Sequence, residues 1–140
     1  MTSHNGTTGG CLCGSVRFMV SGSIAAAAYC HCADCRKCTG SAFNVSVPVD
    51  VAKFKLLSGN PKSFTKTADS GNELTRHFCS DCGSPLFTSS PHHLDRIYVK
   101  AGAFDDPSII VPAHQSWVSS SVPWSSIPPG LPSYAQGRSQ

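Results

Sequence analysis

Short stretches in which apolar and polar residues alternate run along most of the chain. Val16, Phe18 and Val20 alternate with Ser15, Arg17 and Met19, which places the apolar side chains on one face of a strand. The only helical signal is a turn or two near Ala33 to Cys38. The pattern therefore predicts a mainly β fold of short strands. Further strands are predicted at Phe43–Val47, stopped by Pro48, at Phe54–Leu56, closed by the turn Ser58–Pro61, and at Leu74–Phe78, Pro85–Ser89 and Ile97–Ala101.

The pattern changes from Pro112 onward, where five of the ten prolines lie. Proline has no backbone N–H to donate, so this segment is not expected to form a regular helix or a central strand. Trp117 and Trp124 lie in the same segment, and tryptophan is rare in disordered chain. We therefore expect an irregular, proline-rich C-terminal segment laid across the surface of the domain.

Length and composition indicate one soluble domain. The 140 residues are 40% hydrophobic and 14% charged, which excludes a disordered acidic or basic tail protein. We expect a flexible N-terminus at 1–8 and a single domain at 9–137. No apolar run is long enough to span a membrane and no secretory signal is visible, so the expected location is the cytoplasm without a membrane partner. The net charge of +3 is scattered, which disfavours nucleic acid as a partner.

Eight cysteines in three tight groups carry the strongest chemical signal. A framework of disulfides would spread cysteines along the chain, whereas neighbouring thiolates suit a metal ion such as zinc. Metal binding is therefore favoured over a disulfide scaffold. The groups are Cys11 and Cys13; Cys30, Cys32, Cys35 and Cys38; and Cys79 and Cys82.

The spacing within the groups indicates two sites of different kinds. The C-x-C pair at Cys11 and the C-x-x-C pair at Cys79 together supply four sulfurs, a complete tetrahedral site. The C-x-C-x-x-C run beginning at Cys30 supplies three sulfurs and leaves a fourth position open, as in catalytic zinc sites. Cys38 is a possible fourth ligand that would close this second site. Whether the site is open or closed decides between an enzyme and a structural module.

Three sequence blocks resemble the glutathione-dependent formaldehyde-activating family, which also includes centromere protein V. The blocks are G-x-C-x-C-G-x-V-x-F at 9–18, C-H-C-x-x-C-R-K-x-T-G-S-x-F at 30–43 and F-C-x-x-C-G-S-x-L at 78–86, followed by W-x-x-I-P-P-G-L-P-x-Y at 124–134. The resemblance covers most of the chain. It implies a small zinc-stabilised β-tent fold with two zinc ions: a structural zinc on Cys11, Cys13, Cys79 and Cys82 and a second, more labile zinc on Cys30, Cys32 and Cys35.

The resemblance also implies a carbon–sulfur lyase or synthase. Such an enzyme adds glutathione, or a related thiol, to formaldehyde or another small electrophile, or cleaves the adduct. A three-thiolate zinc favours delivery of the thiol over activation of the carbonyl, because three thiolates weaken its Lewis acidity. Arg36 and Lys37 are candidates to contact the carboxylates of glutathione, and Thr39 and Ser41 are candidate hydrogen-bond donors to substrate. Cys38 departs from the family pattern.

Two other classes of function stay open at this point. The chain is alternatively a non-catalytic zinc module that binds a protein or nucleic acid. A redox enzyme resembling methionine sulfoxide reductase would need a reactive cysteine outside the zinc sites, and Cys38 is the spare one. His31 stands between two ligands and is expected to point away from the metal in a structural role. The sequence predicts no oligomeric state.

Overall fold

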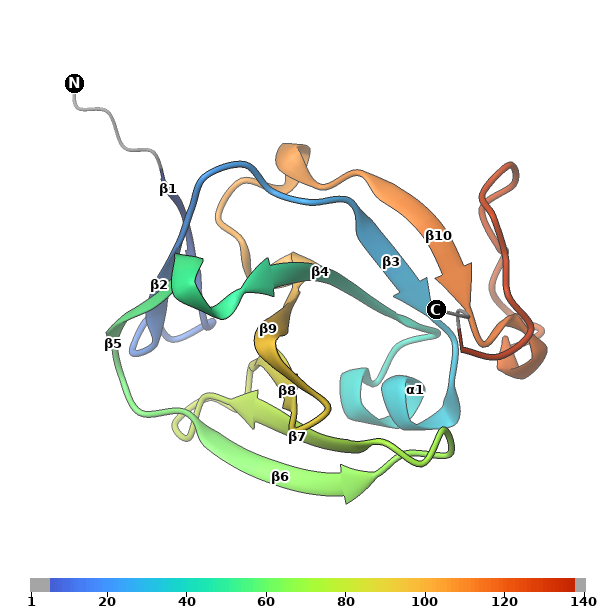
Figure 1. Ribbon diagram of the computed structural model, residues 1–140, viewed down its shortest axis with the longest axis horizontal. Helices are drawn as coiled ribbons and strands as arrows, with labels where there is room; N and C mark the ends of the chain where they lie inside the picture. Colours follow the sequence, from blue (N-terminus) through green and yellow to red (C-terminus); the bar gives the residue numbers. More distant parts are fainter. Residues whose placement is uncertain (1–5, 138–140) are drawn as a thin grey trace.

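Ten short strands form the framework of residues 6–137, the part of the chain that the computed structural model describes (Figure 1). One sheet has three antiparallel strands in the order β1-β2-β5. The other has seven strands in the order β10-β3-β4-β9-β8-β7-β6, in which β10 and β3 run parallel and the other neighbours antiparallel. The prediction of a mainly β fold is confirmed. The strands are β1 (Gly6–Gly10), β2 (Arg17–Ser21), β3 (Ala27–Cys30), β4 (Asn44–Asp50), β5 (Phe54–Ser58), β6 (Lys62–Thr67), β7 (Glu73–Phe78), β8 (Pro85–Ser90), β9 (His93–Lys100) and β10 (Pro112–Ser116).

The apolar residues of the alternating stretches form one core shared by both sheets. Phe18 of β2 is completely buried, and its ring stacks on that of Phe54 with centroids 5.3 Å apart. Phe104 meets the same ring edge-on at 5.6 Å, within the range that favours aromatic pairs. Val47 of β4 and Val99 of β9 are opposite each other and also fully buried. Phe54 of β5 also meets the ring of Phe87 of β8 at 5.0 Å, so apolar packing attaches the small sheet to the large one.

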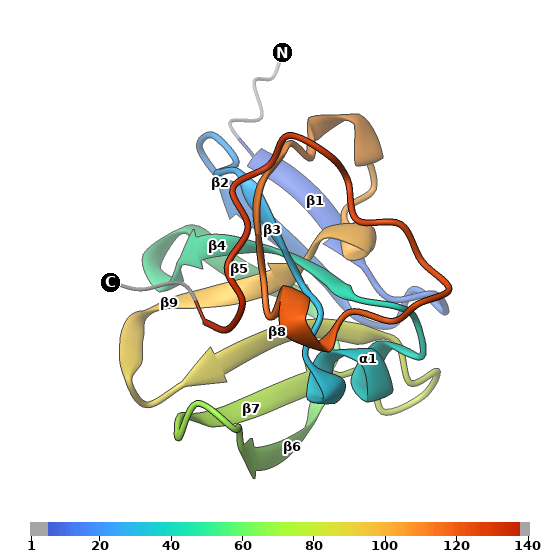
Figure 2. The same ribbon diagram turned by 90° about the vertical axis from the view of Figure 1, so that its right-hand side faces the viewer.

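The one α-helix, α1 (Ala33–Thr39), lies within the described chain where the sequence predicts it. Cys32 caps its N-terminus, because the sulfur accepts a hydrogen bond from the Cys35 amide at 3.3 Å. Gly40 ends it in the left-handed conformation, with φ of 70°. In both views α1 lies beside β6 and β7 (Figures 1 and 2). Short 3₁₀ turns occur at Val51–Lys53, Ala101–Ala103, Pro107–Ile109 and Val118–Ser120.

The prediction that Pro48 ends its strand is wrong. β4 continues to Asp50, and Pro48 lies opposite Tyr98 of β9. On its other side, β4 pairs with β3 only as far as the Ala28–Ser46 pair. A proline is tolerated at this point because no strand follows on that side to accept an N–H from it.

Four strands were not predicted: β1, β3, β6 and β10. β1 is rich in glycine and β3 in alanine, so neither shows the branched or aromatic side chains typical of strands. β6 is an edge strand whose residues are all exposed. β10 begins at a proline and lies at the opposite edge, which agrees with the prediction that the proline-rich segment contains no central strand.

The C-terminal segment runs along the surface beside β10, as predicted (Figure 2). The Gln115 amide donates to Pro132 O and the Tyr134 amide donates to Gln115 O, each at 2.9 Å. The completely buried Gln115 side chain donates to Pro128 O at 3.1 Å and meets Nε2 of buried His31 at 3.0 Å. His31 therefore has the expected structural role, since it helps to anchor this segment.

The N-terminal boundary differs from the expected one by a few residues. β1 begins at Gly6 and pairs with β2 along its whole length, so residues 6–8 are part of the sheet. The rest of the segment expected to be flexible, 1–5, lies outside the described residues. No helix in the described chain is long and apolar enough to cross a membrane.

Candidate metal centres

The first cysteine cluster joins two segments that are far apart in the sequence. Cys11 and Cys13 lie in the turn after β1, and Cys79 and Cys82 lie in the turn between β7 and β8. All four sulfurs lie within 4.8 Å of one another. Gly83 follows in the left-handed conformation, with φ of 78°, which lets the chain turn back into β8. The predicted set of four sulfurs is thus assembled at the edge where the two sheets meet.

The sulfur spacings of this cluster fit a tetrahedral zinc ion. With zinc–sulfur bonds of about 2.3 Å, neighbouring sulfurs in a tetrahedron lie about 3.8 Å apart. The distance from Cys11 Sγ to Cys13 Sγ is 3.6 Å and that from Cys13 Sγ to Cys79 Sγ is 3.8 Å. The four residues can therefore hold one metal ion without rearrangement of the chain.

Hydrogen bonds around the cluster favour the thiolate forms of Cys11 and Cys82. The Val16 amide donates to Cys11 Sγ at 3.2 Å, and the Asp81 amide donates to Cys79 Sγ at 3.3 Å. Burial raises the pKa of Cys11, but these contacts outweigh it, because the Val16 amide and neighbouring side chains lower that pKa to about 7. Hydrogen bonds from the Ser84 side chain and amide lower the pKa of Cys82 to about 5. Outer contacts of this kind orient metal ligands and stabilise their charged form.

The second cluster consists of Cys30, Cys32 and Cys35, whose sulfurs also lie within 4.8 Å of one another. Cys30 ends β3, Cys32 caps α1 and Cys35 lies in its first turn. Hydrogen bonds from the Cys30 and Cys35 thiols, together with the Cys35 amide, outweigh burial and lower the pKa of Cys32 to about 2. The same contacts raise the pKa of Cys30 and of Cys35. Cys32 is therefore the first of the three thiols to lose its proton. A thiolate held between two further sulfurs suits a metal cation.

Cys38 does not belong to the second cluster in the described chain. The group of sulfurs that could share an ion contains Cys30, Cys32 and Cys35 alone. The Cys38 side chain instead lines a separate cavity between α1 and the β6–β7 hairpin. Cys38 therefore does not supply a fourth ligand to the three-cysteine site.

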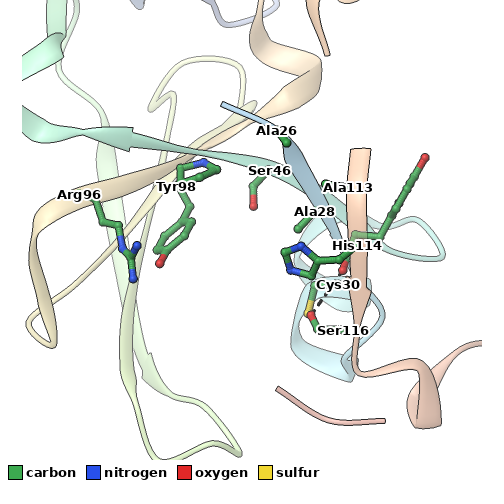
Figure 3. Close-up of a pocket in the computed structure, with 11 residues that line it drawn as sticks. Ala26, Ala28, Cys30, Ser46, Arg96, Tyr98, Ala113, His114 and Ser116 are labelled. Atoms are coloured by element: carbon green, nitrogen blue, oxygen red, sulfur yellow. Dashed lines mark hydrogen bonds between the residues drawn. The ribbon is translucent and has the colours of Figure 1, made fainter. Parts of the chain in front are cut away.

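A cavity of about 380 Å³ reaches the second cluster at Cys30 (Figure 3). It opens where β3 and β4 part, and β9 and β10 supply its remaining walls. Arg96 and Tyr98 lie on one side of it, and Cys30, His114 and Ser116 lie on the other. The Arg96 guanidinium carbon lies 5.7 Å from the centre of the Tyr98 ring, and Arg96 Nε is buried without a hydrogen-bond partner among the described residues.

Comparison with known proteins agrees with these two clusters. Residues 6–120 match the family of the glutathione-dependent formaldehyde-activating enzyme. The chain belongs to this family. A crystal structure of a Rhodobacter sphaeroides protein is similar, with a TM-score of 0.57 and 20% identity, over 75% of this chain and 97% of that one. At this identity the likeness supports the fold alone. No curated protein matches the chain.

The polar residues predicted to bind substrate in this formaldehyde-activating family member lie on or beside α1, in different surroundings. Lys37 is exposed and lines the same cavity as Cys38. Thr39 and Ser41 line a third cavity, of about 700 Å³, beside Cys11. The Thr39 hydroxyl donates to Cys35 O at 2.8 Å and accepts from the Ser41 amide, so it has a structural use at the end of the helix. Arg36 is half-buried and is not among the residues that line the cavity at Cys30. The substrate contacts of these four residues stay predictions.

The sequence did not indicate several residues that surround the clusters. Ser15 Oγ lies 3.2 Å from Cys13 Sγ and 3.3 Å from Cys79 Sγ. Lys100 is buried and donates to Asn44 Oδ1 at 2.6 Å. Burial lowers the pKa of Lys100, whereas the nearby thiols of the α1 region act to raise it. An isolated polar residue in a predicted strand forms no motif with the cysteines in the sequence. Only the pairing of the strands shows that these residues lie near the cysteine clusters.

Proposed function

We propose that this protein is a zinc-dependent carbon–sulfur lyase or synthase of the formaldehyde-activating type. It adds glutathione, or a related thiol, to formaldehyde or another small electrophile, or catalyses the reverse cleavage, in the cytoplasm. The observation that carries the proposal is a cluster of three cysteines, without Cys38, beside a cavity. The four-cysteine cluster holds the structural zinc and the three-cysteine cluster the more labile one.

The number of ligands supports catalysis at the second cluster. A zinc ion takes four ligands, so a site with four cysteines is complete, whereas one with three leaves a position for a substrate atom. A zinc ion bound there would stabilise the thiolate form of the substrate thiol at neutral pH. The position next to Cys30 is the natural place for the glutathione sulfur, because the cavity reaches the cluster at this residue.

The opposite wall of the cavity has the chemistry to hold the rest of a thiol tripeptide. Arg96 Nε is buried and has no hydrogen-bond partner in residues 6–137, and a carboxylate is the group that a guanidinium pairs with best. We therefore assign Arg96 to a carboxylate of glutathione and Tyr98 to packing against its chain. A cavity of about 380 Å³ lies within the range of small-molecule sites. Arg36 and Lys37 do not line this cavity, so they are assigned no contact in it.

Addition of a thiol to an aldehyde forms one carbon–sulfur bond, and the carbonyl oxygen gains the proton that the thiol loses. Ser46 and Tyr98 line the cavity and bring hydroxyl groups to it. We assign these hydroxyls to hydrogen bonding with the aldehyde oxygen as it becomes a hydroxyl. The chain thus holds both reactants at one place, which is the main advantage over the uncatalysed reaction in solution.

The test combines zinc counting with a rate measurement. Native mass spectrometry of the purified protein should show two zinc ions and a glutathione adduct as the thiol is titrated in. The rate of hydroxymethylglutathione formation, measured by NMR exchange, should exceed the spontaneous rate. Cys32→Ser should abolish this excess and release one zinc ion, while the matched variant Cys38→Ser should retain both. Arg96→Gln should raise the glutathione concentration needed, and Lys53→Gln should serve as a neutral control.

Two outcomes would overturn the proposal. Two zinc ions that do not respond to millimolar glutathione would indicate a closed second site and favour a binding module. Activity that depends on Cys38 rather than on Cys32 would favour a redox enzyme.

A further inference from the structure

The cavity between α1 and the β6–β7 hairpin, which the proposed function does not use, has the features of a second ligand site. Its volume is about 500 Å³, and none of the seven clustered cysteines lines it. One wall comes from α1 and the other from β6 and β7, which lie side by side in Figures 1 and 2. The cavity is therefore distinct from the one that reaches Cys30.

Two aromatic rings make the sheet side of this cavity apolar. Phe64 of β6 lies opposite Arg76 of β7, and Phe78 is two residues farther along β7. Residues two apart on a strand share a face, so these side chains all point toward α1. Phe64 is 61% exposed, so much of its ring is accessible to a ligand. The rings leave an apolar surface that an apolar ligand would bury.

The charged residues of the cavity leave an excess of positive charge. Asp34, the one carboxylate among the described residues that line it, already pairs with Lys66 at 2.6 Å across the gap between α1 and β6. Lys37 on the helix and Arg76 on the sheet face the same cavity without a carboxylate partner in the described chain. Two unpaired cations beside an apolar wall are complementary to an organic anion with an apolar body.

We propose that this cavity binds an aliphatic or aromatic carboxylate, whose head pairs with Lys37 and Arg76 and whose body packs on Phe64 and Phe78. Because Cys38 also lines the cavity, a bound ligand covers its thiol. The proposal does not depend on the thiol–electrophile reaction, since it concerns another cavity and none of the metal-binding cysteines.

Cys38 provides the readout for the test. The zinc-loaded protein is treated with iodoacetamide, and the alkylation of each cysteine is followed by peptide mass spectrometry, with octanoate as the probe ligand. Octanoate should slow the alkylation of Cys38, and 1-octanol, which has a similar body but no charge, should protect far less at equal concentration. Isothermal titration calorimetry of octanoate gives the dissociation constant directly.

Charge-removing variants test the assigned residues. Arg76→Gln and Lys37→Gln should each weaken octanoate binding about fivefold, as expected for a partly exposed ion pair. The matched variant Lys53→Gln, at an exposed lysine outside the cavity, should leave binding unchanged. Lys37 is exposed, so its variant remains informative if Arg76→Gln does not fold.

Three results would overturn the proposal. The first is Cys38 alkylation that octanoate does not affect. The second is equal protection by octanoate and 1-octanol, which would show an apolar site without preference for an anion. The third is protection of Cys38 that rises with protein concentration in the absence of octanoate, which would show that a second copy of the chain covers the cavity.

Discussion

The two cysteine clusters should differ in how much they stabilise the fold, and this difference can be calculated from the chain. Cys13 and Cys79 lie in contact although 66 residues separate them in the sequence. A metal ion that links them closes a long loop, which removes entropy from the unfolded chain worth about 4 kcal/mol. The second cluster lies within residues 30–35, and linking so short a segment is worth only about 2 kcal/mol by the same relation.

Paired double variants measure this difference. Cys13→Ser with Cys82→Ser leaves two ligands in the first cluster, and Cys30→Ser with Cys32→Ser leaves one in the second. Neither pair includes the buried Cys11 or Cys79, so the cost of burying a serine hydroxyl is small. Domains of this size are stable by about 5–15 kcal/mol, so a loss of about 4 kcal/mol leaves the first variant folded but clearly less stable.

The assay is equilibrium unfolding in urea with zinc present, followed by circular dichroism. With a dependence on urea of about 2 kcal/mol per molar, the midpoint should fall by about 2 M for the first pair and about 1 M for the second. Cys38→Ser, outside both clusters, should shift it by less than about 0.5 M. Equal midpoints for the two double variants, or a lower one for the second, would refute the argument that the first cluster links distant segments.

Three further predictions concern the fold. Phe18→Ala should lower the free energy of unfolding, measured in urea, by about 3–5 kcal/mol, because the ring is completely buried between Phe54 and Phe104. A loss below about 1 kcal/mol would contradict this packing. Asp105→Asn should lower the free energy of unfolding by no more than about 1 kcal/mol, because the bidentate pair of Asp105 with Arg17 is partly exposed. The difference from the wild type should shrink in 1 M salt, and a loss that salt does not affect would argue against an ion pair. Gln115→Ala removes the contacts to His31 and Pro128, so it should lower the free energy of unfolding by about 1–3 kcal/mol. It should also make the segment after Ser116 more susceptible to limited proteolysis. An unchanged cleavage pattern would show that the segment is held by other contacts.

The cysteine clusters could be predicted because each half of each site is local in the sequence. C-x-C and C-x-x-C spacings bring sulfurs together within a single turn, whatever the rest of the fold does. The four-cysteine set needed one more step, the pairing of two half sites, which the arithmetic of four ligands per ion suggested and the family resemblance implied. The structure places all four sulfurs within reach of one ion, and it leaves Cys38 outside the second group.

The strands with alternating apolar residues could be predicted for a similar reason, since period two is visible within five residues. β1, β3, β6 and β10 were missed because they are held by neighbours rather than by their own side chains. β3 is the clearest case, since its alanines lie between β4 and β10 in the large sheet. Its place depends on pairings with residues far away in the sequence, which no local pattern records.

The cavity at Cys30 depends on the one strand prediction that is wrong. Pro48 signals the end of a strand when β4 is read alone, because proline has no backbone N–H to donate to a neighbouring strand. In the sheet, β9 keeps β4 extended as far as Asp50, while β3 leaves β4 after the Ala28–Ser46 pair. The missing N–H therefore falls where β3 and β4 separate, and Pro48 lines the cavity that opens there. A residue without an N–H toward β3 suits this position, since a further hydrogen bond between β3 and β4 would extend their pairing across the entrance to the three-cysteine cluster.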